Sequence, residues 1–244
     1  MAPQTGATPG FGATLKPQIE ELMKDNAIPG AVLFITSPTK GVWLETFGTG
    51  TIGQNEPMSV NDYFRIGSNT KTMTSTVILQ LAQEGKLKLD DPIATYIPQV
   101  PNGDKITIAN LSEMRSGLYS YSFDPGFNAT LDDDPQKAWT PQEILAIAFS
   151  HPLNGPPGQT FDYCNTNIIL LGLVIEKLTG MSAAEAFQKR LFEPLGLEHT
   201  FLPAATDSAI PDPHPQGYMF GTNVSTIDTY ALPQAEWPAA VDPT

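Results

Sequence analysis

Two serines in this chain are each followed three residues later by a lysine, and their surroundings differ. Ser37 and Lys40 enclose a proline in "SPTK", a turn between two predicted strands. Ser68 and Lys71, in "SNTK", stand at the start of a predicted helix that ends near Gly85. Because positions i and i+3 share one face of a helix, Lys71 can reach the Ser68 hydroxyl. The second pair alone is predicted to hold an amine beside a hydroxyl.

Ser68 and Lys71 have the side chains of a nucleophile and its base. A neutral lysine can take the serine proton, and burial beside the apolar run that follows favours the neutral form. The unpaired N–H groups of a helix start also favour negative charge on an attacked carbonyl. The pattern indicates a Ser–Lys variant of the hydrolase triad. In the alternative reading, Ser68 only caps the helix and Lys71 is solvated.

"FDYCNTN" adds a phenol and an amide in one short segment. Alternate residues of an extended segment point the same way, so Tyr163 and Asn165 should face one side and Cys164 the other. A phenol near Lys71 could relay a proton to a leaving group, and an amide could orient a substrate carbonyl. The alternatives are a core tyrosine and a helix-capping asparagine.

Periodicity and turn residues indicate the elements around these side chains. A helix from Leu15 to about residue 28 precedes two strands, and helices follow for most of the remaining chain. The expected elements are strands at 31–36 and 42–50, a short helix within 110–117, a long loop at 120–139, and helices at 140–150, 165–180 and 182–196. Capping boxes should begin the helices after Thr140 and Ser182. We expect a flexible arm at 1–14, one domain at 15–203 and a Pro-rich loop region at 204–244.

Composition excludes several classes of protein. The 244 residues carry a net charge of −13, which argues against nucleic-acid binding. Cys164 is the only cysteine, and the three histidines show no metal-ligand spacing, so we expect no metal site. No apolar run reaches the roughly 18 residues of a membrane span, and the first residues show no leader pattern.

Three stretches together carry a family resemblance: "FRIGSNTKTMTSTVILQLAQEGKLKLDDPI", "ITIANLSEMRSGLYSY" and "PPGQTFDYCNTNIILLGLVIEKLTG". They resemble the serine β-lactamase and penicillin-binding-protein family, in the branch of class C β-lactamases and secreted D-alanyl-D-alanine carboxypeptidases. The resemblance implies an α/β (α+β) fold with an antiparallel sheet, flanking helices and an all-helical lobe. It implies Ser68 as acylated nucleophile, Lys71 as general base, Tyr163 as proton relay and Asn165 as substrate contact.

The resemblance also implies the reaction and its setting. We expect a serine hydrolase without cofactor that acts through an acyl-enzyme on the D-alanyl-D-alanine end of peptidoglycan stem peptides, with β-lactams as inhibitors or slow substrates. A β-lactamase or an esterase would show the same motifs. Phe123 and Phe127 would line the substrate pocket by analogy, although they could equally anchor their loop. The resemblance implies a secreted or periplasmic protein.

The sequence departs from the family at three positions. Met114 stands where many relatives have histidine, and Cys164 where a small Ser or Ala is expected. No Lys or His is followed two residues later by Gly, and "HPQG" at His214 has the wrong spacing. We therefore expect a C-terminally truncated member without the late strands, with weak turnover and possible self-association through an unpaired sheet edge. A non-catalytic fragment or pseudoenzyme is the alternative.

Overall fold

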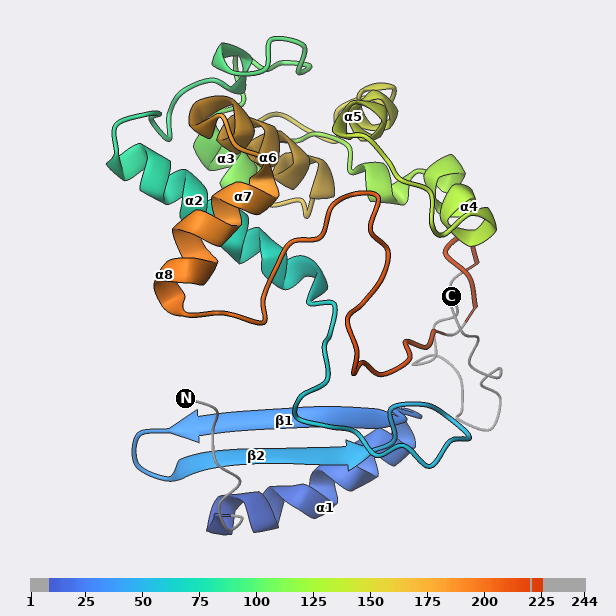
Figure 1. Ribbon diagram of the computed structural model, residues 1–244. Helices are drawn as coiled ribbons and strands as arrows, with labels where there is room; N and C mark the ends of the chain where they lie inside the picture. Colours follow the sequence, from blue (N-terminus) through green and yellow to red (C-terminus); the bar gives the residue numbers. More distant parts are fainter. Residues whose placement is uncertain (1–8, 220, 226–244) are drawn as a thin grey trace. The chain divides into compact units, whose positions relative to one another are not determined.

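The computed structural model describes residues 9–219 and 221–225 (Figure 1). The described residues form two compact units. The sheet unit comprises 9–65 with 209–219 and 221–225, and the helical unit comprises 66–208. Every side chain of the predicted chemistry, from Ser68 to Asn165, lies in the helical unit.

In the sheet unit, helix α1 (Gly10–Asp25) packs on a hairpin of strands β1 (Gly30–Ser37) and β2 (Gly41–Gly48) (Figure 1). The strands are antiparallel, which confirms the predicted pair. Alternation places Trp43 and Phe47 on the face that contacts α1, where they form a small core with Met23. Phe11 meets the Trp43 ring edge-on at 6.1 Å.

The position of Phe11 corrects the predicted arm. The helix begins at Gly10, five residues before the predicted start at Leu15, because Phe11 extends its apolar face. The arm predicted at 1–14 is therefore wrong for residues 10–14, and its residues 1–8 lie outside the described part of the chain.

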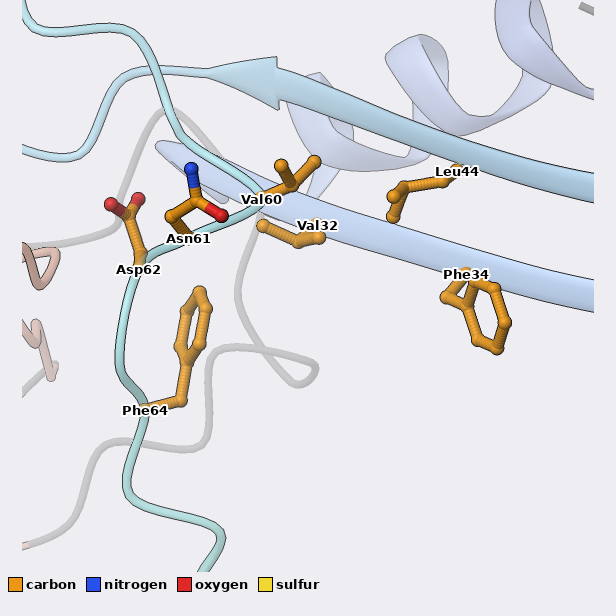
Figure 2. A pocket seen from close by; sticks show the side chains of 7 residues that line it. All are labelled: Val32, Phe34, Leu44, Val60, Asn61, Asp62 and Phe64. Atoms are coloured by element: carbon orange, nitrogen blue, oxygen red, sulfur yellow. The ribbon is translucent and has the colours of Figure 1, made fainter. Parts of the chain in front are cut away.

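The opposite face of the hairpin is apolar and hollowed (Figure 2). Val32 and Phe34 of β1 and Leu44 of β2 line a pocket of about 570 Å³ together with residues of the segment that follows β2. Those residues are Val60, Asn61, Asp62 and Phe64. Phe34 is 54% exposed, so this face carries apolar surface that the described residues do not cover.

A Pro-rich segment returns to the sheet unit near the end of the described chain. Pro213 O accepts from the backbone N–H of Tyr63 at 2.8 Å, and the Tyr218 hydroxyl accepts from the N–H of Ile52 at 2.7 Å. No helix or strand is assigned among the described residues between 204 and 219, in keeping with the loop predicted there. Residue 220 and residues 226–244 of the predicted loop region lie outside the described part of the chain.

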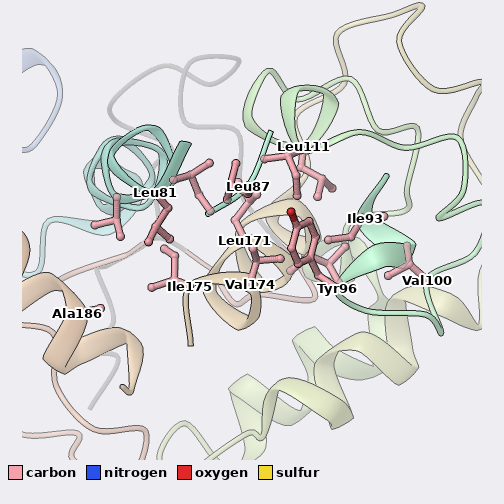
Figure 3. Packing of buried hydrophobic residues seen from close by; sticks show 14 of the residues in the cluster. Leu81, Leu87, Ile93, Tyr96, Val100, Leu111, Leu171, Val174, Ile175 and Ala186 are labelled. Atoms are coloured by element: carbon pink, nitrogen blue, oxygen red, sulfur yellow. The ribbon is translucent and has the colours of Figure 1, made fainter. Parts of the chain in front are cut away.

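The helical unit is built around helix α6 (Asn165–Thr179), which the sequence predicts as a buried helix. Val77, Ile78 and Leu81 of α2 (Thr70–Gln83) pack in one core with Leu171 and Val174 of α6. Figure 3 shows Leu81 of α2 beside the two α6 residues. The remaining elements are η1 (Gly67–Asn69), η2 (Ile93–Thr95), α3 (Ile108–Ser112), η3 (Tyr121–Phe123), α4 (Pro125–Asp133), α5 (Pro141–Phe149), α7 (Ala183–Phe187), the π-helical turn η4 (Gln188–Phe192) and α8 (Glu193–Leu195).

Local capping signals correctly predict several helix ends. Thr140 and Glu143 form a reciprocal capping box at the start of α5, and Ser182 and Glu185 form another at α7. Gly180 ends α6 in a left-handed conformation with φ +69°. In the described residues no single helix is long and apolar enough to cross a membrane; α6 and the segment Ala183–Leu195 meet the test only as a pair bent by 76°.

Two predicted elements need correction. The short helix α3 ends at Ser112, five residues before Gly117. The loop predicted at 120–139 contains η3 and α4. Helix α4 forms because Asp124 accepts a hydrogen bond from the Phe127 N–H at 2.8 Å and Pro125 occupies the first helical position.

Candidate active site

Ser68 lies in the one-turn 3₁₀ helix η1, directly before α2. Gly67 precedes it with φ +48°, in the left-handed region that favours glycine. The predicted helix start is therefore confirmed in place, but Ser68 occupies the middle of a turn and is not an N-cap. The turn presents the Ser68 side chain next to the first residues of α2.

Lys71 lies in the first turn of α2 and donates from Nζ to Ser68 Oγ at 2.8 Å. The predicted i, i+3 contact therefore forms. In the other Ser-x-x-Lys pair, Ser37 Oγ accepts from the backbone N–H of Lys40 at 3.2 Å, a contact that belongs to the hairpin turn. The two Ser-x-x-Lys pairs have the same spacing, but a hydrogen bond between the lysine amine and the serine hydroxyl is seen for Ser68 and Lys71.

Tyr163 completes a triangle of polar groups. Its hydroxyl donates to Ser68 Oγ at 2.7 Å, and Lys71 Nζ lies 4.8 Å from the centre of its ring. Hydrogen bonding with Lys71 and Ser68, together with the positive charge of Lys71, lowers the pKa of the Tyr163 phenol. Ser68 Oγ thus has two short contacts, each to a group that can take or give a proton.

The loop that carries Tyr163 is held along residues 114–117. The N–H of Asp162 donates to Met114 O and that of Gly158 to Arg115 O, both at 2.8 Å. Gly117 has φ +73°, and a Cβ there would lie 2.0 Å from Gly155 O. Glycine at this position therefore lets the loop approach closely enough to bring Tyr163 to Ser68.

Cys164 points away from this triangle, as the alternation predicts. Its side chain is 1% exposed, donates from Sγ to Leu118 O at 3.3 Å and joins the core of the helical unit. Burial raises the pKa of the Cys164 thiol. Tyr163, in contrast, is 40% exposed.

Asn165 is the first residue of α6, and Cys164 occupies the N-cap position. The Asn165 carboxamide donates from Nδ2 to Ser122 Oγ at 2.8 Å, and its backbone N–H donates to Ser120 Oγ at 3.0 Å. Sequence reasoning missed both serines, although they alternate in "YSYS" as Tyr163 and Asn165 do. Ser122 and Ser120 precede Asn165 by 43 and 45 positions, so no local sequence pattern could pair them with it.

The two predicted pocket phenylalanines differ. Phe127 is 8% exposed and packs against Tyr121 at 5.0 Å and Trp139 at 5.1 Å between ring centres, which favours the loop-anchoring alternative. Phe123 is 60% exposed, and its contact with substrate stays a prediction.

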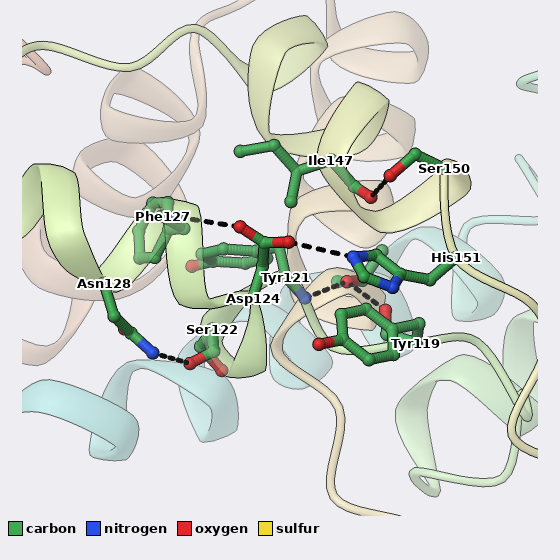
Figure 4. A network of polar contacts seen from close by, with 10 residues as sticks. Tyr119, Tyr121, Ser122, Asp124, Phe127, Asn128, Ile147, Ser150 and His151 are labelled. Atoms are coloured by element: carbon green, nitrogen blue, oxygen red, sulfur yellow. Dashed lines mark hydrogen bonds and ion pairs between the residues drawn. The ribbon is translucent and has the colours of Figure 1, made fainter. Parts of the chain in front are cut away.

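His151 belongs to a polar network that includes Tyr119 and Asp124 (Figure 4). Its Nε2 lies 2.9 Å from Asp124 Oδ2, and its ring stacks on Tyr119 with 3.9 Å between centres. Among the residues that the structure describes, no three His, Cys, Asp or Glu side chains are grouped to hold a metal ion. The chemistry that the described side chains offer is that of a serine hydroxyl between an amine and a phenol.

Comparison with known proteins shows which protein family the chain matches. The beta-lactamase family model matches residues 15–228. The chain is 30% identical to protein flp of Staphylococcus aureus strain MW2 over 187 residues, covering 75% of this chain and 36% of the relative. It is 31% identical to the putative penicillin-binding protein PbpX of Bacillus subtilis strain 168 over 146 residues, 60% of this chain and 34% of that protein.

Solved structures agree with these sequence matches. A D-stereospecific amidohydrolase from a Streptomyces species superposes with a TM-score of 0.79 and 33% identity, covering 94% of this chain and 64% of that one. A D-amino acid amidase from Ochrobactrum anthropi SV3 gives 0.72 and 28%, over 85% and 58% of the two chains. The chain thus spans about a third of these curated relatives and less than two thirds of the two solved structures.

Proposed function

Because the chain belongs to the beta-lactamase family, we propose that it is a serine hydrolase that forms an acyl-enzyme at Ser68. We further propose an activity like that of the D-alanyl-D-alanine carboxypeptidases. The observation that carries the proposal is the pair of short contacts from Lys71 Nζ and Tyr163 OH to Ser68 Oγ.

Acylation begins when a base removes the Ser68 proton. Lys71 Nζ, which lies 2.8 Å from Ser68 Oγ, is the base that takes this proton. Ser68 Oγ then bonds to the carbonyl carbon of the scissile amide, and the carbonyl oxygen becomes negatively charged. The N–H groups that begin η1 and α2 favour that charge.

Collapse of this intermediate needs a proton for the leaving amine. Tyr163 supplies it from its hydroxyl, and its lowered pKa makes it a better acid than an ordinary phenol. Lys71 returns the serine proton to Tyr163, the C–N bond breaks, and the acyl group remains as an ester on Ser68. Water attacks the ester by the same steps in reverse, which releases the acid and restores the serine.

A D-stereospecific amidase is a second candidate. It is favoured by the two similar structures, whose names describe a D-stereospecific amidohydrolase and a D-amino acid amidase. Both candidate reactions cleave an amide next to a D-residue, so they differ in the leaving group. Comparing release of D-alanine from a D-alanyl-D-alanine peptide with release of ammonia from a D-amino acid amide separates them. A β-lactamase, an esterase or a non-catalytic acyl-binding protein remain alternatives.

Covalent labelling tests the nucleophile. A fluorescent penicillin should label the peptide that contains Ser68, and Ser68→Ala should abolish the label. Ser37→Ala is the matched control, because Ser37 has the same spacing to a lysine but lies in a turn, and it should label like the wild-type chain. Label on the Ser37 peptide, or unchanged labelling of Ser68→Ala, would contradict the assignment.

We also propose that the protein is exported, as the family resemblance implies, since stem peptides and β-lactams occur outside the cytoplasm. Fractionation of the source cells, followed by detection of the chain with an antibody, tests this.

A further inference from the structure

Two serine hydroxyls enclose Asn165 from both its main chain and its side chain. Ser120 Oγ accepts the Asn165 backbone N–H at 3.0 Å, and Ser122 Oγ accepts from Nδ2 at 2.8 Å. The two hydroxyl oxygens lie 3.0 Å apart. The three residues therefore form a closed ring of hydrogen bonds, which we call the serine clamp.

The hydrogen-bond inventory of the clamp is consistent. Each serine hydroxyl has one proton to donate and two lone pairs that accept. Because Ser120 Oγ accepts the Asn165 N–H, its own proton is free to go to Ser122 Oγ. Ser122 Oγ can accept this proton together with the one from Nδ2. Ser120 is 1% exposed, so water does not compete for its hydroxyl.

Neighbouring contacts hold the clamp in place. Thr166 Oγ1 accepts from the Tyr121 N–H at 3.2 Å and donates to Tyr119 O at 2.8 Å. The segment that carries both serines is thereby fixed to the first turn of α6. The side chain of Asn128 in α4 donates to Ser122 O at 3.3 Å, which ties the same segment to the helix that follows (Figure 4).

A carboxamide at the start of a helix normally turns about its terminal torsion, which is broad and weakly restrained. The bond to Ser122 removes that freedom. In an acylation site, a small misplacement of a positioning group costs a large factor in rate. Restraining the Asn165 carboxamide is therefore a reason for a serine at position 122, and this reason is separate from the capping of a helix.

We propose that Ser122 is a positioning residue that fixes the Asn165 carboxamide for substrate, with Ser120 supporting it through the ring. The contribution to catalysis rests on the proposed function, in which Asn165 contacts substrate. The contribution to Asn165 geometry does not, so the two are measured separately.

The geometry is tested in the substrate-free chain by NMR. Ser122→Ala should shift and broaden the Asn165 side-chain NH₂ signals, and Ser122→Thr, which keeps the hydroxyl, should largely restore them. Ser112→Ala is the matched control: it removes a serine hydroxyl in the same unit that bonds the Ile108 carbonyl, and it should leave the Asn165 signals unchanged. Asn165 signals unaffected by Ser122→Ala would overturn the clamp whether or not the chain is active.

The catalytic part is tested by a double-mutant cycle on the second-order rate of Ser68 acylation by fluorescent penicillin. Ser122→Ala should lower this rate about tenfold, as for loss of one hydrogen bond, and Ser122→Thr should recover most of it. In an Asn165→Ala background the same change should have no further effect, because Ser122 acts through Asn165. Equal losses in both backgrounds would overturn the positioning role. Absence of labelling in the wild-type chain would count against the proposed function and leave the NMR result to decide the clamp.

Discussion

At the residue scale, the site depends on one oxygen with two partners. Lys71 Nζ and Tyr163 OH both reach Ser68 Oγ within 2.8 Å, so either could serve as the base. Lys71 also lowers the pKa of the Tyr163 phenol more than any other neighbour, chiefly through a hydrogen bond. Substituting one residue is therefore expected to alter the contribution of the other. The rates of the two single variants do not separate the contributions of Lys71 and Tyr163 to catalysis.

We predict that Lys71→Ala lowers acylation by about 10²–10⁴-fold, the range of a lost general base, and that Tyr163→Phe has a smaller effect. Lys71→Ala should also raise the pKa of Tyr163, because the hydrogen bond with Lys71 is the main cause of the lowered value. Labelling kinetics measure the first effect, and ultraviolet titration of phenolate the second, with Tyr163→Phe identifying the signal. A larger loss from Tyr163→Phe would assign the base to the tyrosinate.

At the element scale, the sequence predicts what is local and misses what is distant. The capping boxes at Thr140 and Ser182 are visible because four consecutive residues contain the whole interaction. Helix α4 is missed because a Pro- and Gly-containing stretch reads as loop, although Asp124 and Pro125 form a recognisable helix start. The serine clamp joins segments 43 and 45 residues apart, so only the folded chain shows it.

The cap of α4 gives a pH-dependent prediction. Bonds from the Phe127 N–H and from His151 hold the pKa of Asp124 below its ordinary value of about 3.9. A carboxyl whose pKa is lower in the folded state stabilises the fold above its unfolded pKa, and this contribution is lost as pH falls through the folded value.

Asp124→Asn keeps an acceptor but removes the charge, so it should destabilise the helical unit at pH 7 by about 0.5 kcal/mol. Melting temperatures measured from pH 7 to pH 3 should show the gap to the wild-type chain closing below about pH 4. Asp104→Asn, at an exposed position, is the control and should show little effect. A gap that has not narrowed by pH 3 would contradict the assigned role of Asp124.

At the scale of the whole molecule, the helical unit and the sheet unit differ in how completely they are packed. The helical unit has a continuous core of buried side chains from α2, α6 and α7 (Figure 3). In the sheet unit, the described residues supply two strands that pair only with each other. Helix α1 covers one face of this hairpin, and the other face holds the hollow of Figure 2.

We propose that the hairpin makes the chain self-associate. Unpaired N–H and C=O groups on an outer strand are a template for another strand, and an isolated hairpin is marginal in water. Phe34 on β1 and Val42 on β2 are half-exposed and add apolar surface next to those edges. The same geometry explains why a net charge of −13 need not prevent association, since backbone pairing and apolar burial act at short range.

Phe34→Lys should reduce association, because a lysine on an edge strand opposes strand pairing and removes apolar contact. Sedimentation velocity at increasing protein concentration should show the wild-type chain shifting to larger species and Phe34→Lys remaining closer to monomer. Leu22→Lys is the matched control: Leu22 is an exposed apolar residue of α1, off the strands, so its replacement should leave association unchanged. A wild-type chain that stays monomeric at every concentration, or equal effects of the two lysines, would show that the strands are not the contact.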